Sequence, residues 1–192
     1  MGSAIAKPFL ALEGREILAY TLDVFEQCAA IAEIWVIVAE QYQAWCQQAI
    51  VERYGFQKVC GVVVGGPTRQ DSVWRGLLQV SSQTDLVIVH DGVRPFVTEQ
   101  IVQATLEHAA VKGAAIAAIP VKDTLKKVSP AGEVECTVPR EHLWRVQTPQ
   151  AFQRPLLQAA FRQAWAQGLW GTDEAGLVEA FGHPVTVVPG LE

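Results

Sequence analysis

A carboxylate and a guanidinium come directly after an apolar run in the stretch DLVIVHDGVRP, residues 85–95. If the run is a strand of an open parallel sheet, Asp91 and Arg94 lie near its carboxyl end, where such sheets bind ligands. One carboxylate can hold Mg²⁺ when substrate phosphates and water complete the octahedron. Asp91 is therefore a candidate metal ligand, although a turn cap that pairs with Arg94 explains these residues equally well.

A second candidate site is the segment GGPTRQDSVWRGL, residues 65–77. It follows an apolar run and opens a helical pattern, so the N–H groups of Gly65 and Gly66 can approach a ligand, and the helix start favours an anion. Arg69 and Ser72 add side-chain donors on successive turns. A plain strand-to-helix turn explains the same segment, and a glycine pair alone favours that simpler interpretation.

Four other polar residues interrupt apolar or turn-rich stretches. They are Lys7 in AKPFLAL, Thr124 in KDT, Arg140 in PREHLW and Thr148 in QTPQ. Taken alone, each is explained as an ordinary surface or loop residue. No protein nucleophile is evident, because Ser72 lacks the GxSxG setting of an esterase, and His142 and His183 have no spaced partners that would suggest a triad or a zinc site.

Five short β-rich runs must position these side chains. They cover residues 34–39, 59–66, 85–91, 114–121 and 185–190. Their nearly continuous apolarity is typical of strands that helices cover on both faces.

Helical patterns fill the intervals between the runs. The first expected helix begins near Leu18, and the others cover 40–53, 70–80, 98–112, 154–168 and 172–181. Alternation of strands and helices predicts a three-layer α/β/α sandwich around a mostly parallel, doubly wound, Rossmann-like sheet.

The interval 123–146 breaks this alternation. Polar and apolar residues alternate around SPAG, in which Pro130 and Gly132 suit the second and fourth positions of a type I turn. We expect a β-hairpin arm that leaves the main body. Because a two-stranded hairpin is barely stable alone in water, we expect the arm to pack on a second subunit and to form a homodimer.

Length, composition and charge limit the classes of protein to which the chain can belong. The 192 residues fit one domain, residues 1–192, and 50% of them are apolar. A net charge of −5 argues against a nucleic-acid partner, and no run of 18 or more apolar residues or signal-peptide pattern indicates a membrane partner or export. The four cysteines are widely separated, as in a reducing compartment, so we expect a cytoplasmic protein.

Taken in order, these stretches resemble the 2-C-methyl-D-erythritol 4-phosphate cytidylyltransferases. The matching stretches are AKPFLALEGREIL, GGPTRQDSV, VHDGVRP, PVKDTLKK, TVPREHLW, QTPQAF and GTDEA. Each is weak singly, but their order and spacing are specific. The resemblance implies transfer of CMP from CTP to 2-C-methyl-D-erythritol 4-phosphate, with pyrophosphate released and Mg²⁺ as cofactor. Open alternatives are a ribitol 5-phosphate cytidylyltransferase, a sugar-nucleotide transferase that uses another base, and a non-catalytic dimeric protein.

The resemblance also implies a role for each matching residue. Lys7 and Arg140 are the catalytic candidates: Lys7 stabilises charge on the α-phosphate, and Arg140 grips a phosphate from the arm. Asp91 is the Mg²⁺-linked aspartate. The residues that frame cytosine and ribose are Gly65, Gly66, Arg69 and Ser72. The residues implied for the sugar phosphate are Thr124, Arg140 and Thr148, with Arg94 near the same pocket.

The resemblance stops short at both ends. The family begins with a buried strand and a glycine-rich loop that contains an arginine, whereas this chain starts at MGSAIAK and stops at PGLE, before a family segment with a further lysine. The family also has HDAARP where this chain has HDGVRP. We therefore expect a fragment with weak or no activity. Loss of a central first strand would leave its neighbours with unpaired backbone groups.

Overall fold

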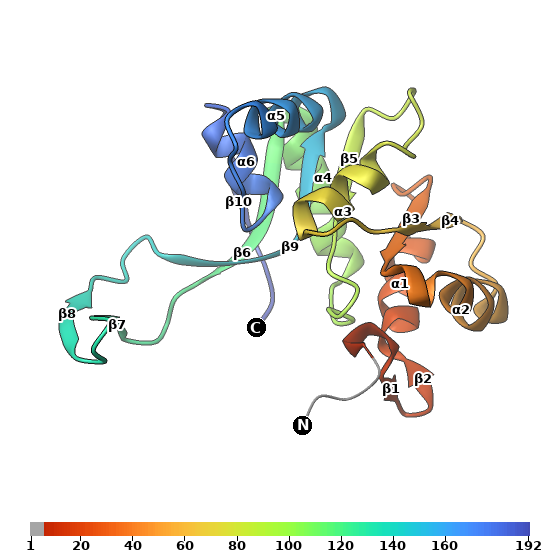
Figure 1. The fold of residues 1–192 in the computed structure, drawn as a ribbon, viewed down its shortest axis with the longest axis horizontal. Coiled ribbons are helices and arrows are strands. Elements are labelled where there is room, and N and C mark those ends of the chain that lie inside the picture. Colours follow the sequence, from red (N-terminus) through yellow and green to blue (C-terminus); the bar gives the residue numbers. More distant parts are fainter. Residues whose placement is uncertain (1–5) are drawn as a thin grey trace.

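The computed structural model describes residues 6–192 of the chain (Figure 1). Residues 1–5, where the sequence predicts the end of a glycine-rich loop, lie outside the described residues. Within the described range, the strands of the main body are β3 (Ile34–Val38), β4 (Val59–Val64), β5 (Leu86–Val89), β6 (Ala114–Pro120), β9 (Trp144–Gln153) and β10 (Thr186–Pro189). The α-helices are α1 (Ile17–Gln27), α2 (Gln43–Cys46), α3 (Arg69–Leu77), α4 (Glu99–Lys112), α5 (Arg154–Ala166) and α6 (Glu174–Ala180).

These bounds confirm the expected elements, with one change of detail. Each of the five predicted apolar runs contains an observed strand, and each predicted helical interval contains a helix. The interval 40–53 is helical throughout but changes type along its length. A 3₁₀ turn at Glu40–Tyr42 leads into α2, and a π-helical segment at Gln47–Glu52 follows it.

The predicted α/β fold is confirmed, and its strands pair in both the parallel and the antiparallel direction. Strands β10, β6, β9 and β5 form one sheet in that order, and β3 and β4 form another. The pairs β10–β6 and β3–β4 are parallel, whereas β9 runs antiparallel to both β5 and β6. Taken alone, Thr148 in QTPQ is interpreted as an ordinary loop residue. In the fold, Thr148, Pro149 and Gln150 are buried in the middle of the sheet.

Helices cover both faces of the strands, as the three-layer prediction requires. On one face, Phe25 of α1 and Val102 of α4 pack with Ala115 and Ala151 of the sheet. On the other face, side chains from α3, α5 and α6 form a separate core; they include Leu77, Phe161, Leu177 and Phe152 of β9. Helix α2 packs beside α1 over β3 in a third cluster. The sandwich therefore encloses the carboxyl ends of the strands between helices.

Side-chain caps fix the first turns of the helices that border these strand ends. Helix α3 follows Thr68, whose hydroxyl accepts from the Asp71 N–H at 3.1 Å while the Asp71 carboxylate accepts from the Thr68 N–H at 3.2 Å. This reciprocal pair is a capping box. Helix α6 follows Asp173, whose carboxylate accepts from the Gly176 N–H at 3.0 Å.

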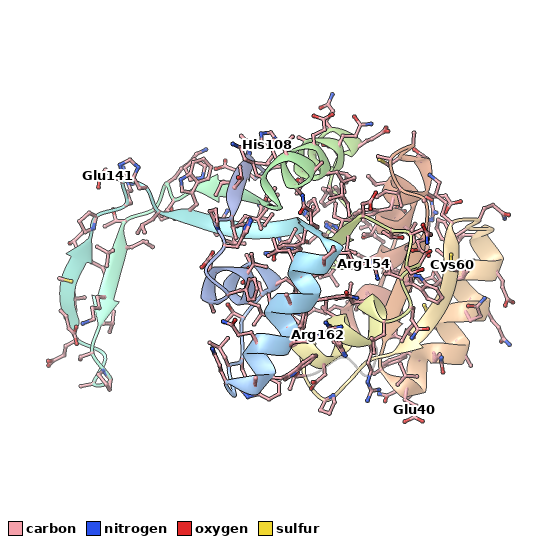
Figure 2. The ribbon with its side chains drawn as sticks, turned by 90° about the horizontal axis from the view of Figure 1, so that it is seen from above. Glu40, Cys60, His108, Glu141, Arg154 and Arg162 are labelled. Carbon is pink, nitrogen blue, oxygen red and sulfur yellow. The ribbon has the colours of Figure 1, made fainter. Side chains whose placement is uncertain are left out.

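The expected hairpin arm is present and projects from the body (Figures 1 and 2). Strands β7 (Leu125–Val128) and β8 (Val134–Val138) pair antiparallel, and Gly132 donates to the Ser129 carbonyl at 2.9 Å across the predicted turn. Figure 2 shows Glu141 on the arm, at the opposite end of the molecule from Cys60. Val128 is 50% exposed and Val134 is 61% exposed, so the arm carries apolar surface that this chain does not cover. Dimerisation through the arm stays a prediction.

The molecule contains a large cavity between two of its strands. Strands β3 and β5 belong to different sheets, and the space between them is a cavity of about 1050 Å³. None of the helices over residues 6–192 combines the length and the apolarity needed to cross a lipid bilayer.

Candidate active site

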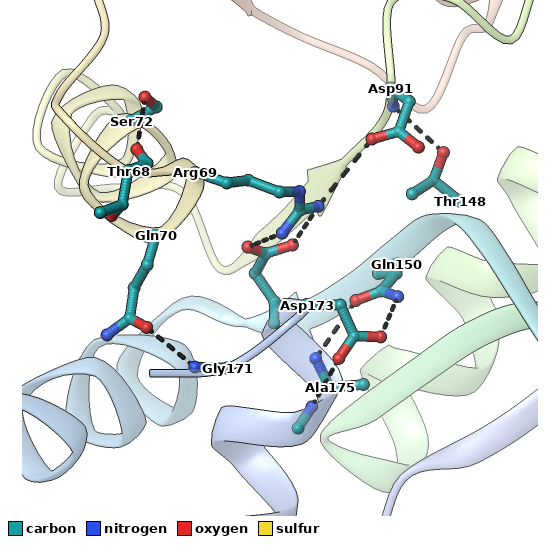
Figure 3. Close-up of polar contacts among 12 residues, drawn as sticks. Thr68, Arg69, Gln70, Ser72, Asp91, Thr148, Gln150, Gly171, Asp173 and Ala175 are labelled. Atoms are coloured by element: carbon teal, nitrogen blue, oxygen red, sulfur yellow. Dashed lines mark hydrogen bonds and ion pairs between the residues drawn. The ribbon is translucent and has the colours of Figure 1, made fainter. Parts of the chain in front are cut away.

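Polar side chains converge where β4 and β5 end and β9 passes beside them (Figure 3). The Asp91 N–H donates to the Thr148 hydroxyl at 3.1 Å, which ties the end of β5 to β9. An Arg69 Nη2 lies 3.9 Å from an Asp91 carboxylate oxygen, which ties the start of α3 to the same place. Side chains that are 79 residues apart, at positions 69 and 148, therefore border one site on either side of Asp91.

The glycine turn before α3 has a tightly fixed backbone. A Cβ on Gly66 would stand 2.3 Å from the Cβ of Asp71, so no side chain fits there. The Gly66 N–H donates to the Ser72 hydroxyl at 3.0 Å, and that hydroxyl donates to the Thr68 carbonyl at 2.8 Å. Arg75 donates to the Gly65 carbonyl at 2.9 Å. Ser72, a predicted ligand contact, thus also holds the turn in shape.

Arg69 is oriented by a buried carboxylate that the sequence analysis did not select. Its two terminal nitrogens donate to the two oxygens of Glu174 at 2.6 and 2.8 Å. Glu174 is 1% exposed, and burial raises the pKa of its carboxyl group, while the hydrogen bonds and charge of Arg69 act in the opposite direction. The Arg69 side chain remains 40% exposed, so its guanidinium borders solvent and the site together.

A second hydrogen-bond network fixes the helix that carries Glu174. The Gln150 amide donates to the Asp173 carboxylate at 2.8 Å, and its oxygen accepts from the Ala175 N–H at 3.2 Å. Gln150 is 1% exposed and belongs to β9. Gln150 lies in the stretch QTPQ, and its partners Asp173 and Ala175 lie in GTDEA. Only their tertiary contacts show that these residues hold α6 against the sheet beside Arg69.

Asp91 offers one carboxylate oxygen that is not hydrogen-bonded by a neighbouring side chain. Its Oδ2 accepts from the Arg94 Nε at 2.9 Å, whereas the contact of Oδ1 with Arg69, at 3.9 Å, is an ion pair without a hydrogen bond. Within residues 6–192, no group of three or more histidine, cysteine or acidic residues is placed to hold a metal. Asp91 therefore fits Mg²⁺ only as a single ligand that leaves most positions to phosphates and water.

His90 is a further site residue that the sequence analysis left without a role. Its Nε2 lies 3.2 Å from the Arg94 carbonyl, which can only accept, so Nε2 carries the hydrogen. Its Nδ1 then accepts from the Thr148 hydroxyl at 3.0 Å. Burial against Phe25, with ring centres 5.0 Å apart, lowers the pKa of His90 to about 4. A neutral imidazole therefore orients Thr148 at pH 7.

The remaining predicted residues do not join this cluster within one chain. Lys7 is exposed in a 3₁₀ turn, Lys7–Phe9, while Thr124 and Arg140 are exposed on the arm. The Arg140 guanidinium donates to the carbonyl of Lys122 at the base of the arm. Among the residues described, no hydrogen bond or ion pair links these three to Asp91 or Thr148. The arm lies far from α3 in Figure 1.

The sequence of the chain is similar to those of one protein family. Residues 1–192 match the family model of 2-C-methyl-D-erythritol 4-phosphate cytidylyltransferase. A protein of that name from Geotalea uraniireducens is 46% identical over 192 residues, which are 99% of this chain and 82% of that protein.

Solved structures agree with this match. The crystal structure of 4-diphosphocytidyl-2C-methyl-D-erythritol synthase from Anaerococcus prevotii has a TM-score of 0.87 at 32% identity, and covers 99% of this chain and 83% of its own. That of 2-C-methyl-D-erythritol 4-phosphate cytidylyltransferase from Thermus thermophilus has a TM-score of 0.79 at 38% identity, with 96% and 83% covered. The family model matches the chain from end to end and the relatives are longer, so the expected truncation stays a prediction.

Proposed function

This chain belongs to the 2-C-methyl-D-erythritol 4-phosphate cytidylyltransferase family, and from that premise we propose that it transfers CMP from CTP to the phosphate of 2-C-methyl-D-erythritol 4-phosphate and releases pyrophosphate. The observation that carries the proposal is the meeting of Arg69, Asp91 and Thr148 where β4 and β5 end. In α/β sheets of this kind, ligands bind at the carboxyl ends of the strands.

The reaction brings a phosphate oxygen up to another phosphate, so two anions must be held together. Catalysis then depends on positioning and on cations that neutralise the developing charge. Arg69 supplies a guanidinium whose plane Glu174 fixes. Asp91 would hold Mg²⁺, which when bound neutralises charge on the phosphates. No protein nucleophile is needed for this in-line transfer.

The glycine turn is proposed to receive the cytidine end of CTP. Asp71 packs against Gly66 where a side chain would stand, and the N–H groups of Gly65 and Gly66 already donate to the Val38 carbonyl at 2.7 Å and to the Ser72 hydroxyl at 3.0 Å. Gly65 and Ser72 complete the same turn, and Arg69 borders it. The role proposed for the glycines is therefore to fix the shape of the turn, which Ser72 and Arg75 also hold, and Arg69 supplies the donor that faces the site.

The acceptor phosphate is proposed to bind between Thr148 and an arm from a second copy of the chain. Thr148 is held by His90 and by the Asp91 N–H. Thr124 and Arg140 are carried by the arm, whose reach away from its own body supports a role in a homodimer. Arg140 can bind a phosphate with two parallel hydrogen bonds. Arg94 contributes positive charge beside Asp91.

Lys7 is proposed to neutralise charge on the α-phosphate. The turn that carries it is anchored by Phe9, whose ring centre lies 4.9 Å from those of Tyr42 and Trp45. Tyr42 follows β3, so the turn is fixed near the same end of the strands as the candidate site. Lys7 is exposed on this turn, which supports the proposed role at the phosphates.

Pyrophosphate release from CTP, with and without Mg²⁺, tests the proposal. We expect turnover with 2-C-methyl-D-erythritol 4-phosphate that requires Mg²⁺, little with ribitol 5-phosphate, and little when UTP or GTP replaces CTP. The names of the relatives favour this acceptor over ribitol phosphate. A folded, N-terminally extended form of the chain that binds no CTP and shows no Mg²⁺-dependent turnover would overturn the proposal and favour a non-catalytic role.

A further inference from the structure

Thr148 lies at the border of a smaller cavity, of about 290 Å³. Apolar side chains form much of the wall, among them Phe96, Val97 and Leu191, and Arg94 lines the same cavity. Thr148 belongs to β9 and is 8% exposed, so the strand fixes its backbone and only a small part of its surface is open. The protein groups around the Thr148 hydroxyl therefore decide which kind of ligand group it can meet.

Two hydrogen-bond positions of this hydroxyl are occupied within the protein. A hydroxyl group has two lone pairs and one proton. The backbone N–H of Asp91 lies 3.1 Å from the Thr148 oxygen, and because an N–H can only donate, this contact uses one lone pair (Figure 3). The other partner is Nδ1 of His90, which is 3.0 Å away. The state of that nitrogen decides whether the Thr148 proton is free.

The tautomer of His90 follows from its other ring nitrogen. Nε2 lies 3.2 Å from the carbonyl oxygen of Arg94, which can only accept, so Nε2 carries a hydrogen. In a neutral ring Nδ1 then has a lone pair and accepts the proton of Thr148. In an imidazolium Nδ1 would donate instead, and the Thr148 proton would be free to face an anion. The charge of one ring thus determines whether Thr148 accepts from a ligand or donates to it.

The surroundings of the ring favour its neutral form. Phe25 packs on His90 with ring centres 5.0 Å apart, and burial lowers the pKa of His90 to about 4. The two charges that face the ring act in opposite directions, because Asp91 raises this pKa and Arg94 lowers it. At neutral pH the imidazole is therefore uncharged, and the Thr148 proton points to Nδ1.

The loop between β5 and α4 is held at several points, which preserves this arrangement. The Arg94 N–H donates to the Asp91 carbonyl at 3.0 Å, and the Thr21 hydroxyl of α1 donates to the Gly92 carbonyl at 3.0 Å. Turning the Thr148 proton toward a ligand would leave Nδ1 of a largely buried imidazole without a donor. An unsatisfied buried acceptor is unfavourable, so the proton stays with the ring.

We propose that Thr148 accepts a hydrogen bond from a hydroxyl group of the acceptor and does not donate to its phosphate, and that His90 is the positioning residue that sets this preference. The inference rests on the proposed function, whose acceptor carries both a phosphate and hydroxyl groups. The second pKa of a phosphate ester is about 6, so at pH 8 its oxygens have no proton to give. They need donors such as the Arg94 guanidinium, whose side chain is 44% exposed. The free lone pair of Thr148 is left to a hydroxyl.

Nitrogen NMR of the His90 ring tests the inference in the unsubstituted site. The ring signals of the labelled chain are assigned by their loss in His90→Asn. At pH 8 we expect a proton on Nε2 and none on Nδ1, both in the free chain and after addition of 2-C-methyl-D-erythritol 4-phosphate. A proton on Nδ1 in either state overturns the inference, because Thr148 would then donate to the phosphate. The free chain gives its result even if no acceptor binds, so failure of the proposed function is recognised separately.

Acceptor analogues identify the group that Thr148 contacts. Binding of 2-C-methyl-D-erythritol 4-phosphate is compared by calorimetry with binding of its three analogues in which one hydroxyl is replaced by hydrogen. We expect Thr148→Val to weaken binding of the full acceptor about tenfold, the effect of one hydrogen bond, and to have no further effect on one of the analogues. An equal loss for all four compounds overturns the inference, since Thr148 would then contact the phosphate.

Two further variants separate the hydroxyl from other effects of the substitution. Thr148→Ser restores the hydroxyl that Thr148→Val lacks and should recover most of the lost affinity. Thr186→Val on the far-edge strand β10 is the matched control, because it removes a threonine hydroxyl away from the site and should change neither acceptor binding nor the His90 ring signals. If Thr148→Val does not fold, the ring spectrum still decides, because it uses the parent chain.

Discussion

Arg69 and Glu174 form two hydrogen bonds, at 2.6 and 2.8 Å, although 105 residues separate them in the chain. The carboxylate is buried and the guanidinium is partly exposed. Glu174 cannot reach solvent, whereas Arg69 also faces Asp91 at 3.9 Å. The buried carboxylate therefore fixes the plane of an arginine that lies at the surface of the site.

Replacing Glu174 by glutamine tests whether this carboxylate positions Arg69. The amide keeps the shape but has one acceptor oxygen, so one Arg69 nitrogen loses its partner. Loss of a charged hydrogen bond costs about 1.5 kcal/mol or more, which is about tenfold in an equilibrium constant. We expect KM for CTP to rise about tenfold in Glu174→Gln, with a smaller change in kcat, measured by pyrophosphate release.

The matched control is Glu179→Gln, an exposed glutamate on the same helix. It removes the same charge without touching Arg69, and its KM should equal that of the parent. If Glu174→Gln lowers the free energy of unfolding but leaves KM unchanged, the pair is structural only, and the positioning role is wrong.

Substitution of Gly66 by alanine should disrupt the glycine turn. The added Cβ would lie 2.3 Å from the Cβ of Asp71 and 3.2 Å from its backbone carbon, so α3 or the turn must shift. Overpacking of this kind costs about 1–3 kcal/mol. We expect the free energy of unfolding in urea to fall by that amount and CTP binding to weaken more than tenfold.

Pro67→Ala is the control for this turn, because Pro67 is its exposed neighbour. It should bind CTP as the parent does. Normal CTP affinity in Gly66→Ala would show that the nucleotide does not use this backbone.

The sequence predicts where the strands end, because local apolarity marks the strands. The positions of the strand ends then determine which residues meet at that edge of the sheet. That Asp91 and the Gly65–Gly66 turn lie together follows from parallel strands that deliver their carboxyl ends to one edge. Glu174 and Gln150 could not be predicted as partners of this site, since their roles depend on contacts between segments far apart in the chain. A buried glutamate and a buried glutamine have no local pattern that distinguishes them from exposed ones.

One strand of the sheet was not predicted from the sequence. Strand β9 was missed because Pro149 and Gln150 disfavour a strand locally, and burial between β5 and β6 overrides that preference. The resemblance implies that Lys7 reaches the site and that Thr124 and Arg140 reach it on an arm from a second subunit, and these placements stay predictions.

His90 makes stability depend on pH in a defined window. Burial lowers its pKa from about 6.5 to about 4, so between these values the unfolded chain binds a proton that the folded chain does not. This contribution is complete above pH 6.5 and is lost as pH falls toward 4. We expect the free energy of unfolding to fall by up to about 1.4 kcal/mol per pH unit in this window, measured by urea denaturation.

His90→Asn isolates this contribution, because the amide oxygen can still accept from Thr148 while the titrating ring is gone. Its unfolding free energy should vary less between pH 6.5 and 4 than that of the parent. His108→Asn removes an exposed histidine on α4 and should leave the parent slope intact. Parallel slopes for His90→Asn and the parent would contradict the assignment.

Deletion of the arm tests both the homodimer and the acceptor site. Most of the residues at 123–143 are exposed, and the apolar side chains of Val128 and Val134 gain burial only against another surface. Replacing the arm by a short glycine linker should therefore give a monomer in light scattering. Because Thr124 and Arg140 leave with the arm, KM for the acceptor should rise by at least about a hundredfold, since a bidentate arginine–phosphate contact contributes about 3 kcal/mol.

Arg140→Ala separates these two effects, since the arm then remains and only the proposed phosphate contact is lost. It should stay dimeric and show a raised KM for the acceptor, with CTP binding unchanged. The charge-matched control is Lys126→Ala on β7, which removes an exposed cation from the same arm and should alter neither property. A dimer that persists without the arm would show that the interface lies elsewhere. An unchanged KM for the acceptor in Arg140→Ala would show that the arm does not bind the acceptor.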